Sequence, residues 1–420
     1  MVHTCGTVRE NAFVITRIAA AALLTMGVLW GTATASAKTP LAWVGTWAAA
    51  QVAPAATGLS HTGFKDETVR DIVRTSVGGS EIRLRISNVF GTKPLTINDV
   101  RVALSGTGAA MLAGSSHRVT FGGRDTVTIP VGKREFSDPV KLGVGAEHDL
   151  TVSIYAKQAT GPATWHPAAI ATSYYSTVGD HTAAAGAAAF PHKIGAWYFL
   201  DGVDVVNPAV AGAVVAFGAS TSDGVGSTLN GNERYTDDLA RRLLQLPAGL
   251  RMSVLNAGIS GNQVLTDSKG TAGQSALNRF YRDAIQQTGV RVIILWEGTN
   301  DIGEHPGINA AQLIDAYLQL IAMAHSRGIA VIGATLQPDQ GASYYTPQGN
   351  QVRRAVNHWI RSSGAFDAVA DFDVVLRDPQ DPAAMLPAYD SGDHLHPNDA
   401  GYKAIANSIN LQELVSLESS

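Results

Sequence analysis

Apolar and polar residues follow two different patterns along the chain. Between about Lys38 and Ala188 they alternate in short runs, for example Thr68 to Val77 and Ser80 to Val89, with Gly, Pro and Asp between the runs. A period of two is typical of β-strands with one buried face. Because this region shows many such runs and no convincing helical pattern, we expect a β-sandwich that is jelly-roll-like.

Two local features of this first region lead to further expectations. Gly78 and Gly79 separate the first two runs, and a Gly-Gly pair between alternating runs predicts a β-hairpin. Trp43, Trp47 and Trp165 could line a sugar-binding face or pack inside the protein. We favour packing, because aromatic side chains carry so much buried area.

After Ala213 the pattern changes to short apolar runs that alternate with helical segments. The expected strands are 213–217, 252–256, 290–296, 329–335 and 368–372. Helix starts are indicated by Thr236, by Asn309 with Gln312 three residues later, and by Thr346 before Pro347. Such alternation predicts a parallel sheet with helices on both faces. We place the domain boundary near Val205, which gives a β-rich domain over 38–204 and an α/β domain over 205–420.

Composition narrows the class of protein. The chain has 420 residues, 45% hydrophobic and 16% charged, with a formal net charge of −4. A core of this extent excludes global disorder, and the slightly acidic balance argues against a nucleic-acid partner and against binding to anionic membranes. We expect a monomer.

The first 37 residues have the features of a secretory signal peptide. Arg9 and Arg17 precede an apolar run over 18–29, and Ala35-Ser36-Ala37 follows as a cleavage pattern. The run is shorter than the roughly 20 residues that span a bilayer, so secretion with cleavage near Ala37 is favoured over a membrane anchor. The single cysteine, Cys5, lies before this site, so the mature chain would hold no disulfide and no thiol nucleophile.

Three polar stretches follow the expected strands of the second region. They contain Ser220, then Asn300 with Asp301, and finally Asp393 with His396. In open parallel sheets, ligands bind beyond the carboxyl ends of the strands, which is where we expect all three stretches to fall. A serine, a histidine and a carboxylate are the groups that nucleophilic acyl transfer needs. Taken alone, a serine after a strand is more often a helix cap than a nucleophile. The turn at Gly258 and Gly261 could aim backbone N–H groups at a developing oxyanion, but it is equally well an ordinary strand-to-helix turn.

Together these stretches resemble the SGNH hydrolases, also called GDSL-type esterases and lipases. Ser220, Gly261 and Asn300 match the first three residues of that name, and Asp393 with His396 match its final D-x-x-H block. The resemblance covers about 205–410. With its β-rich first part and the WVGTW start, the whole chain resembles a secreted, two-part, actinobacterial-type member.

The resemblance implies a three-layer flavodoxin-like α/β fold and a role for each matched residue. Ser220 would be the nucleophile, His396 the base and Asp393 the residue that orients it. The backbone N–H groups of Ser220 and Gly261 and the amide of Asn300 would form the oxyanion hole. The chain departs from the family at Ala219, where the family has aspartate; Ser222 or Asp223 could supply the missing hydrogen-bond acceptor.

Other polar residues carry weaker expectations. Asn262, Gln263 and Trp296 could line the substrate pocket, and Asp301 is expected to brace a turn. A metal site at Asp393, His394 and His396 is disfavoured, because no second ligand cluster accompanies them. Five other histidines are expected at the surface: His166, His181, His305, His325 and His358.

The sequence therefore predicts a secreted serine esterase that needs no metal and no organic cofactor. Short-acyl or O-acetyl esters, including those on carbohydrates, are the favoured substrates, because a secreted enzyme here carries an appended β-rich region. One alternative is a lipase or arylesterase acting on longer acyl chains. The other is a carbohydrate-binding protein whose hydrolase domain has decayed.

Overall fold

The computed structural model of the protein describes residues 43–268 and 270–417. The expected signal peptide and its cleavage site lie outside these ranges. Within them, no helix combines the length and the apolar character that crossing a membrane requires.

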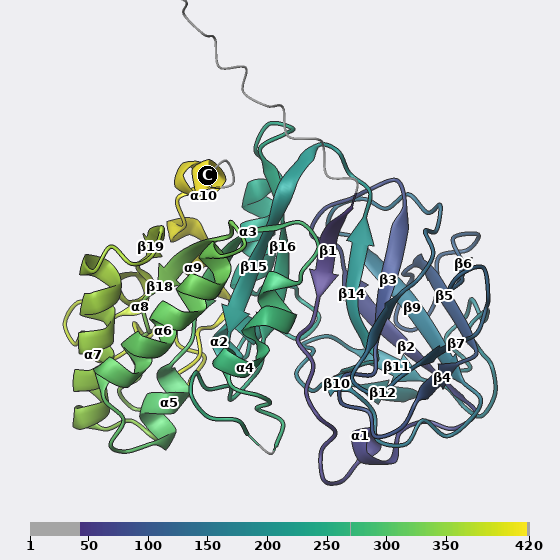
Figure 1. Ribbon diagram of the computed structural model, residues 1–420, viewed down its shortest axis with the longest axis horizontal. Coiled ribbons are helices and arrows are strands. Elements are labelled where there is room, and N and C mark those ends of the chain that lie inside the picture. Colours follow the sequence, from purple (N-terminus) through teal and green to yellow (C-terminus); the bar gives the residue numbers. More distant parts are fainter. Residues whose placement is uncertain (1–42, 269, 418–420) are drawn as a thin grey trace, which may run out of the picture. The chain divides into compact units, whose positions relative to one another are not determined.

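The first region is built from antiparallel strands, and several of them, such as β1 (Val44–Ala48) and β14 (Leu200–Val205), are buried on both faces (Figure 1). One sheet runs in the order β1 (Val44–Ala48), β14 (Leu200–Val205), β3 (Ile82–Ser87) and β8 (Arg134–Phe136). A second sheet runs in the order β12 (His192–Ile194), β11 (Ser173–Tyr175), β2 (Glu67–Arg74), β9 (Asp149–Ala156), β5 (Asp99–Leu104) and β6 (His117–Val119). Smaller elements complete the region: the pairs β10 (Trp165–His166) with β13 (Trp197–Tyr198) and β4 (Leu95–Ile97) with β7 (Val127–Ile129), and the short helix α1 (Leu59–Thr62).

The hairpin predicted at Gly78 and Gly79 is wrong. β2 pairs with β9 and β11, whereas β3 pairs with β14 and β8, so the two runs belong to different sheets. Gly79 instead bonds to a distant segment, donating its N–H to the carbonyl of Val144 at 3.0 Å. The local signal failed because both runs find their partners far along the chain: β2 pairs with β9, and β3 pairs with β14.

Two of the three tryptophans that could have formed a sugar-binding face pack against other aromatic rings, and Trp43 lies against the guanidinium of Arg83. Trp47 is 9% exposed and meets Trp197 edge-on, with ring centroids 5.0 Å apart. Trp165 stacks on Tyr198 and donates its indole N–H to the carbonyl of Ala53 at 3.1 Å. The packing interpretation is therefore confirmed for these two residues.

The second region forms a parallel sheet whose strands match the predicted apolar runs. Its order is β16 (Arg251–Gly258), β15 (Val210–Gly218), β17 (Val290–Trp296), β18 (Ala330–Ala334) and β19 (Ala368–Ala370). The first strand in sequence, β15, thus lies between the second and the third, which is the flavodoxin-like order. The edge between β15 and its neighbours is where this topology places ligands.

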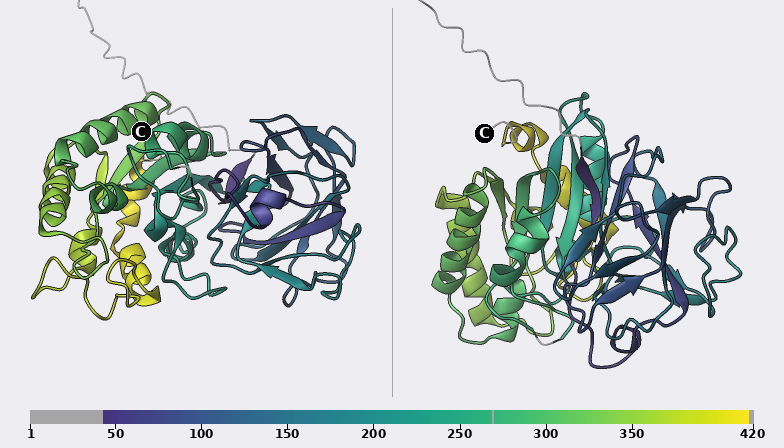
Figure 2. Two further views of the ribbon diagram at one scale, coloured as in Figure 1. Left: turned by 90° about the horizontal axis from the view of Figure 1, so that it is seen from below. Right: turned by 45° about the vertical axis from the view of Figure 1, so that its right-hand side comes forward.

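Helices connect the strands and cover the sheet (Figures 1 and 2). They are α2 (Ser220–Asp223), α3 (Tyr235–Leu243), α4 (Ala276–Phe280), the π-helical turn η1 (Tyr281–Ile285), α5 (Thr299–Glu304), α6 (Ala310–His325), α7 (Pro347–Ser362), α8 (Phe372–Leu376), α9 (Asp399–Ser408) and α10 (Leu411–Leu417). α3 packs with α9, whereas α6 packs with α4 and α7. Right-handed crossovers that leave β15 toward opposite edges put these two sets on opposite faces, which gives three layers.

Two of the three predicted helix starts are confirmed. Asn309 and Gln312 form a capping box at α6, and the Thr346 hydroxyl caps α7 ahead of Pro347. The third is wrong, because Arg234, two residues before Thr236, occupies the cap position and α3 begins at Tyr235. Asp237 accepts the backbone N–H of Arg234 at 3.1 Å, so a carboxylate three residues into the helix replaces the expected threonine.

The two regions share one hydrophobic core, which runs from the antiparallel sheets into the parallel sheet. Polar contacts join them as well: Gly45 donates its N–H to the Thr288 carbonyl at 2.9 Å, and Arg85 donates to the Gln287 side chain at 3.1 Å. The antiparallel region ends with β14 at Val205 and the parallel sheet begins with β15 at Val210. The two regions are therefore joined by both apolar packing and hydrogen bonds.

Candidate active site

The first two polar stretches of the parallel region end up side by side because their strands end at the same level. In the register of the sheet, Gly218 at the end of β15 lies opposite Gly258 of β16 and Trp296 of β17. Ser220 opens α2 directly after β15, and Asn300 lies in the first turn of α5 after β17. Strand geometry alone thus brings two of the predicted site residues to one edge.

A third segment, the loop between α8 and α9, brings a histidine and an aspartate to this edge. His396 Nε2 lies 2.8 Å from Ser220 Oγ, and His396 Nδ1 lies 2.5 Å from Asp393 Oδ2. The other oxygen of Asp393 accepts the backbone N–H of His396 at 2.9 Å. Ser220, His396 and Asp393 therefore form one hydrogen-bonded chain, with the histidine in the middle.

The burial of these three groups decreases from the serine outward. Ser220 is 9% exposed, the His396 side chain 12% and the Asp393 side chain 50%. Partial desolvation raises the pKa of Asp393, but hydrogen bonds from the His396 ring and from the N–H groups of His396 and Leu395 outweigh it and lower the pKa to about 2. The carboxylate is therefore ionised at neutral pH and acts as a fixed negative partner for the imidazole.

A glycine lets this loop approach α2 closely. A Cβ atom at Gly226 would lie 2.5 Å from the Pro397 carbonyl oxygen, and its φ of +92° is one that other residues rarely adopt. The loop is also fixed from its own side, since Asn398 caps α9 and donates its amide to the carbonyls of Ala388 and Asp390. These constraints fix His396 near Ser220 without contacts from the substrate.

Asn300 lies beside Ser220, and both line a small pocket of about 10 Å³ that Trp296, Gln337, Tyr344 and Leu395 also border. The Asn300 amide donates to the carbonyl of Asn262 at 2.8 Å, and its oxygen accepts from the Tyr344 hydroxyl at 3.2 Å. The amide has a second N–H, which these bonds leave available. Gly261, one residue before Asn262, has a φ of +79°, so a glycine suits this turn.

The structure corrects the expectation that Asn262 touches the substrate. Its side chain is fully buried and donates to the carbonyls of Ala272 and Gln274 at 2.6 and 2.7 Å, while its oxygen accepts from Arg279 at 2.7 Å. Asn262 therefore fastens the turn that carries Gly261. Trp296 does border the pocket, but it is only 1% exposed, with its ring between Tyr235 and Phe372.

Arg279, which sequence reasoning missed, ties the ends of three strands together. Its fully buried guanidinium donates to the carbonyls of Gly218 and Ala257 at 2.8 Å each, and lies 3.4 Å from the Glu297 carboxylate. One side chain thus holds the ends of β15, β16 and β17. A lone arginine in a helical segment gives no sequence signal for this role.

Two aspartates brace the turns, as the sequence suggested they could. Asp301 accepts the backbone N–H groups of Val264 and Leu265 at 2.7 and 3.0 Å. Burial raises its pKa to about 6, although these two hydrogen bonds oppose the change. Asp223 accepts both the N–H and the hydroxyl of Ser260, at 3.0 and 2.6 Å. The turn before Gly261 therefore has a carboxylate support, although position 219 holds alanine.

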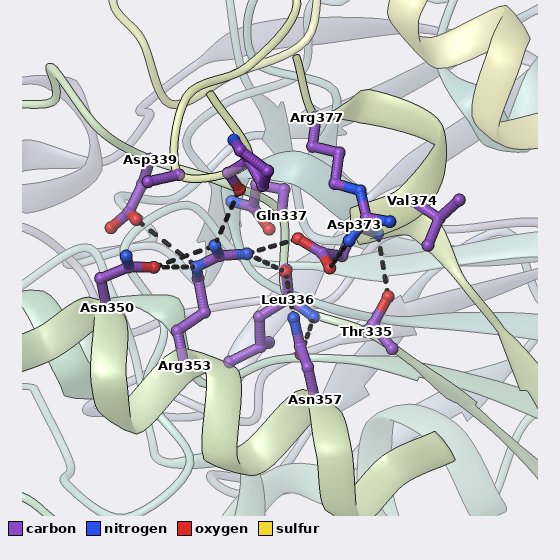
Figure 3. Close-up of polar contacts among 12 residues, drawn as sticks. Thr335, Leu336, Gln337, Asp339, Asn350, Arg353, Asn357, Asp373, Val374 and Arg377 are labelled. Atoms are coloured by element: carbon purple, nitrogen blue, oxygen red, sulfur yellow. Dashed lines mark hydrogen bonds and ion pairs between the residues drawn. The ribbon is translucent and has the colours of Figure 1, made fainter. Parts of the chain in front are cut away.

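The loop after β18 completes the rim of the pocket, and a cluster around Arg353 of α7 holds it (Figure 3). Arg353 donates to the Leu336 carbonyl at 3.2 Å and to Asp373 at 2.5 Å. Asn357, one helical turn later, bonds the backbone N–H and the carbonyl of Leu336 at 2.7 and 2.8 Å. Because Gln337 follows directly, these bonds fix the residue that borders the pocket.

The histidines outside this chain of hydrogen bonds have different environments. The His394 ring forms a hydrogen bond with Asp390 at 2.6 Å and forms none with His396.

Among the residues that the structure describes, no group of three or more His, Cys, Asp or Glu side chains is arranged to hold a metal ion. The expectation of a surface position is wrong for His166, which is 2% exposed because it packs between the two regions.

The fold and the site together define an α/β enzyme of the hydrolase class, with a serine, a histidine and an aspartate at the carboxyl edge of a parallel sheet. Residues 216–404 match the model of the GDSL-like Lipase/Acylhydrolase family. This part of the chain is therefore similar to GDSL-like lipases and acylhydrolases, and the protein is a carboxylic-ester hydrolase.

Solved structures similar to the chain cover about half of it. They include a member of the lipolytic protein G-D-S-L family from Veillonella parvula (19% identity, 47% of this chain and 94% of that one, TM-score 0.36). Est24, a carbohydrate acetylesterase from Sinorhizobium meliloti, shows 13% identity over 49% of this chain and 99% of its own, with a TM-score of 0.39. An aryl esterase of M. smegmatis shows 14% identity over the same shares, with a TM-score of 0.40. A search of curated proteins gave no match.

Proposed function

We propose that the protein hydrolyses carboxylic esters through Ser220, His396 and Asp393. The observation that carries the proposal is the hydrogen-bonded chain from Ser220 Oγ through the His396 ring to Asp393, with distances of 2.8 and 2.5 Å. His396 Nε2 takes the hydroxyl proton while Oγ attacks the ester carbonyl. The ionised Asp393 holds the ring in the required tautomer and stabilises its charged form.

The reaction then proceeds by acyl transfer to water. The tetrahedral intermediate breaks its bond to the alcohol oxygen, and His396 gives its proton to the leaving alcohol. A water that His396 deprotonates attacks the acyl-enzyme, and the acid leaves as Ser220 regains its proton. No step needs a metal or an organic cofactor.

The oxyanion is held by three donors in this proposal. They are the backbone N–H groups of Ser220 and Gly261 and the second N–H of the Asn300 amide. Ser220 is the first residue of α2, so its N–H has no acceptor within that helix and can face the substrate. Two observations support Asn300: it borders the same pocket as Ser220, and its amide is already oriented by Asn262 and Tyr344.

For the substrate we infer a short acyl group, including O-acetyl groups on carbohydrates. The pocket beside Ser220 has about 10 Å³, which is room for about one water molecule, and Trp296 closes one side of it. The alternative is a lipase or arylesterase that takes longer acyl chains. A series of p-nitrophenyl esters from acetate to palmitate tests this: kcat/KM should fall steadily beyond butyrate, and a maximum at octanoate or longer would reject the short-acyl assignment.

The remaining parts of the chain fit a secreted enzyme of two parts. We infer that residues 1–37 are removed near Ala37, that the antiparallel sheets form a β-sandwich, and that the chain is a two-part, actinobacterial-type member that acts as a monomer. Expression of the full chain with its own leader tests the first point. N-terminal sequencing of the protein in the culture medium should begin near Lys38.

A further inference from the structure

The antiparallel region contributes a buried histidine to the far side of α2, the helix that Ser220 opens. His166 lies in β10 and is 2% exposed. Its Nε2 atom lies 2.9 Å from Asp223 Oδ1, and Asp223 is the last residue of α2. The contact joins positions 57 residues apart and crosses from the first region of the chain to the second.

Both ring nitrogens of His166 face hydrogen-bond acceptors. Nδ1 lies 2.6 Å from the Ala50 carbonyl oxygen, and Nε2 lies 3.2 Å from that of Ala168 as well as near Asp223. A neutral imidazole donates from one nitrogen only, so its other lone pair would point at an acceptor oxygen. The surroundings therefore favour the doubly protonated ring. Burial lowers the pKa of His166, but the charge of Asp223 and the hydrogen bonds outweigh it, and the pKa is raised above 6.5.

Asp223 also contacts the turn that carries Gly261. Its Oδ2 atom accepts the N–H of Ser260 at 3.0 Å and the hydroxyl of Ser260 at 2.6 Å. The backbone of Gly258 packs closely against that of Asp223, since a Cβ atom on Gly258 would lie 2.3 Å from the Asp223 backbone nitrogen. His166, Asp223 and Ser260 thus form a continuous path that ends one residue before a proposed oxyanion donor.

We propose that His166 is a positioning residue for ester hydrolysis, acting through Asp223 to fix the turn at Ser260 and Gly261. The inference rests on the function proposed above. An oxyanion donor contributes most when it is already oriented before charge develops on the substrate. The His166 ring donates to one oxygen of Asp223, and the other oxygen accepts both the N–H and the hydroxyl of Ser260. Without the ring, the buried carboxylate would be left uncompensated and would loosen this hold.

Other charged groups lie near His166 and Asp223 and bear on how kcat would depend on pH. Arg234 donates to the Asp223 carbonyl at 3.1 Å and to the carbonyl of Ala169. A cavity of about 90 Å³ borders His166 and Asp223, so water can reach the pair. The charged residues across this cavity are Arg74, Glu147, Asp149 and Asp237.

The test compares His166→Gln with the wild type on p-nitrophenyl acetate, beside Ser220→Ala. Glutamine can still donate to Asp223 but carries no charge. We expect kcat to fall about tenfold while KM stays within about twofold, because only transition-state binding is weakened. Inhibition by a phenylboronic acid, which needs the oxyanion donors, should weaken by the same factor. The wild-type kcat should also decline at alkaline pH as His166 loses its proton, and this decline should be missing in the variant.

A matched control is His181→Gln, also in the antiparallel region, whose ring bonds to Thr177 and Val178. It should leave kcat unchanged. A kcat of His166→Gln within twofold of the wild type, with Ser220→Ala inactive, would overturn the inference. Activity in Ser220→Ala would instead reject the proposed function itself.

A second variant decides the matter if His166→Gln does not fold. Ser260→Ala keeps the backbone N–H but removes the hydroxyl that Asp223 accepts at 2.6 Å. We expect kcat to fall about threefold and boronate inhibition to weaken with it, because the turn is held by one bond instead of two. Unchanged kcat and inhibition in this variant would contradict the proposal.

Discussion

His396 Nε2 and Ser220 Oγ lie 2.8 Å apart, although 176 positions separate the two residues in the chain. Ser220 opens α2, the first helix after β15, and His396 lies in the loop just before α9. Their contact depends on the order of the parallel sheet, which places β15 in its interior, and on the close approach of the final loop at Gly226. The predictions below test whether this contact and its supports do the chemistry that we assign to them.

Replacing His396 should remove activity without unfolding the protein. In His396→Gln no base can take the proton from Ser220, so kcat on p-nitrophenyl acetate should fall at least about 10³-fold. His394→Gln is the matched control, because His394 lies two residues away but bonds to Asp390 and is 55% exposed. It should keep kcat within about threefold. Equal losses of kcat in the two variants would mean that activity depends on the structure of the loop and not on the His396 ring.

Replacing Asn300 should weaken the transition state more than the ground state. Asn300→Ala removes one oxyanion donor, which typically costs about 10²- to 10³-fold in kcat. Steady-state kinetics on the acetate ester should show this loss with little change in KM. Asn309→Ala serves as a control: it removes the cap of α6, which should lower the free energy of unfolding by about 1 kcal/mol and leave kcat unchanged. A normal kcat in Asn300→Ala would exclude the amide from the oxyanion hole.

Arg279 should be a determinant of stability. Arg279→Met leaves the buried Glu297 carboxylate without its cation and frees the carbonyls of Gly218 and Ala257, so the free energy of unfolding should drop by about 3–5 kcal/mol. Urea denaturation measures the loss. Adding Glu297→Gln to this variant should recover part of it, because burial already raises the pKa of Glu297 well above its ordinary value and a neutral amide has no charge to desolvate. A drop below about 1 kcal/mol in the single variant would refute the bracing role.

Asp301 should make stability depend on pH between about 4 and 6. Its pKa in the folded protein is about 6, above the ordinary value of 3.8, so the folded state holds the proton more tightly than the unfolded state. This contribution to stability is complete below pH 3.8 and is lost as the pH rises through 6. The wild type should therefore lose stability relative to Asp301→Asn over this interval, as seen in urea midpoints. A constant stability gap between the wild type and Asp301→Asn over this interval would contradict the prediction.

The sequence predicts the parallel region well because its signals are local and strong. The apolar run 290–296 is β17 as expected, and the starts of α6 and α7 follow from Asn309 and Thr346. The stretches around Ser220 and Asn300 could be placed together because the carboxyl ends of parallel strands share one edge. The third stretch, with His396, is also expected at a strand end, but it lies in the loop between α8 and α9. The periodicity of apolar residues and the residues that cap helices are enough to predict such strands and helix starts.

What the sequence could not supply are contacts that depend on distant partners. The strands on either side of Gly78 look like a hairpin, but each finds its partners elsewhere in the chain. His166 looks like a surface histidine, and only the packing of β10 against α2 buries it beside Asp223. Asn262 resembles a pocket residue until Arg279 and two backbone carbonyls are seen to occupy its side chain.

The most direct test of the proposed function is hydrolysis of p-nitrophenyl acetate by the mature protein and by Ser220→Ala, both with EDTA present. The circular dichroism spectra of the two proteins should be the same. We predict that the wild type remains active in EDTA and that Ser220→Ala loses at least about 10³-fold in kcat. Comparable activity in both proteins, or loss of wild-type activity in EDTA, would contradict a mechanism in which Ser220 is the nucleophile.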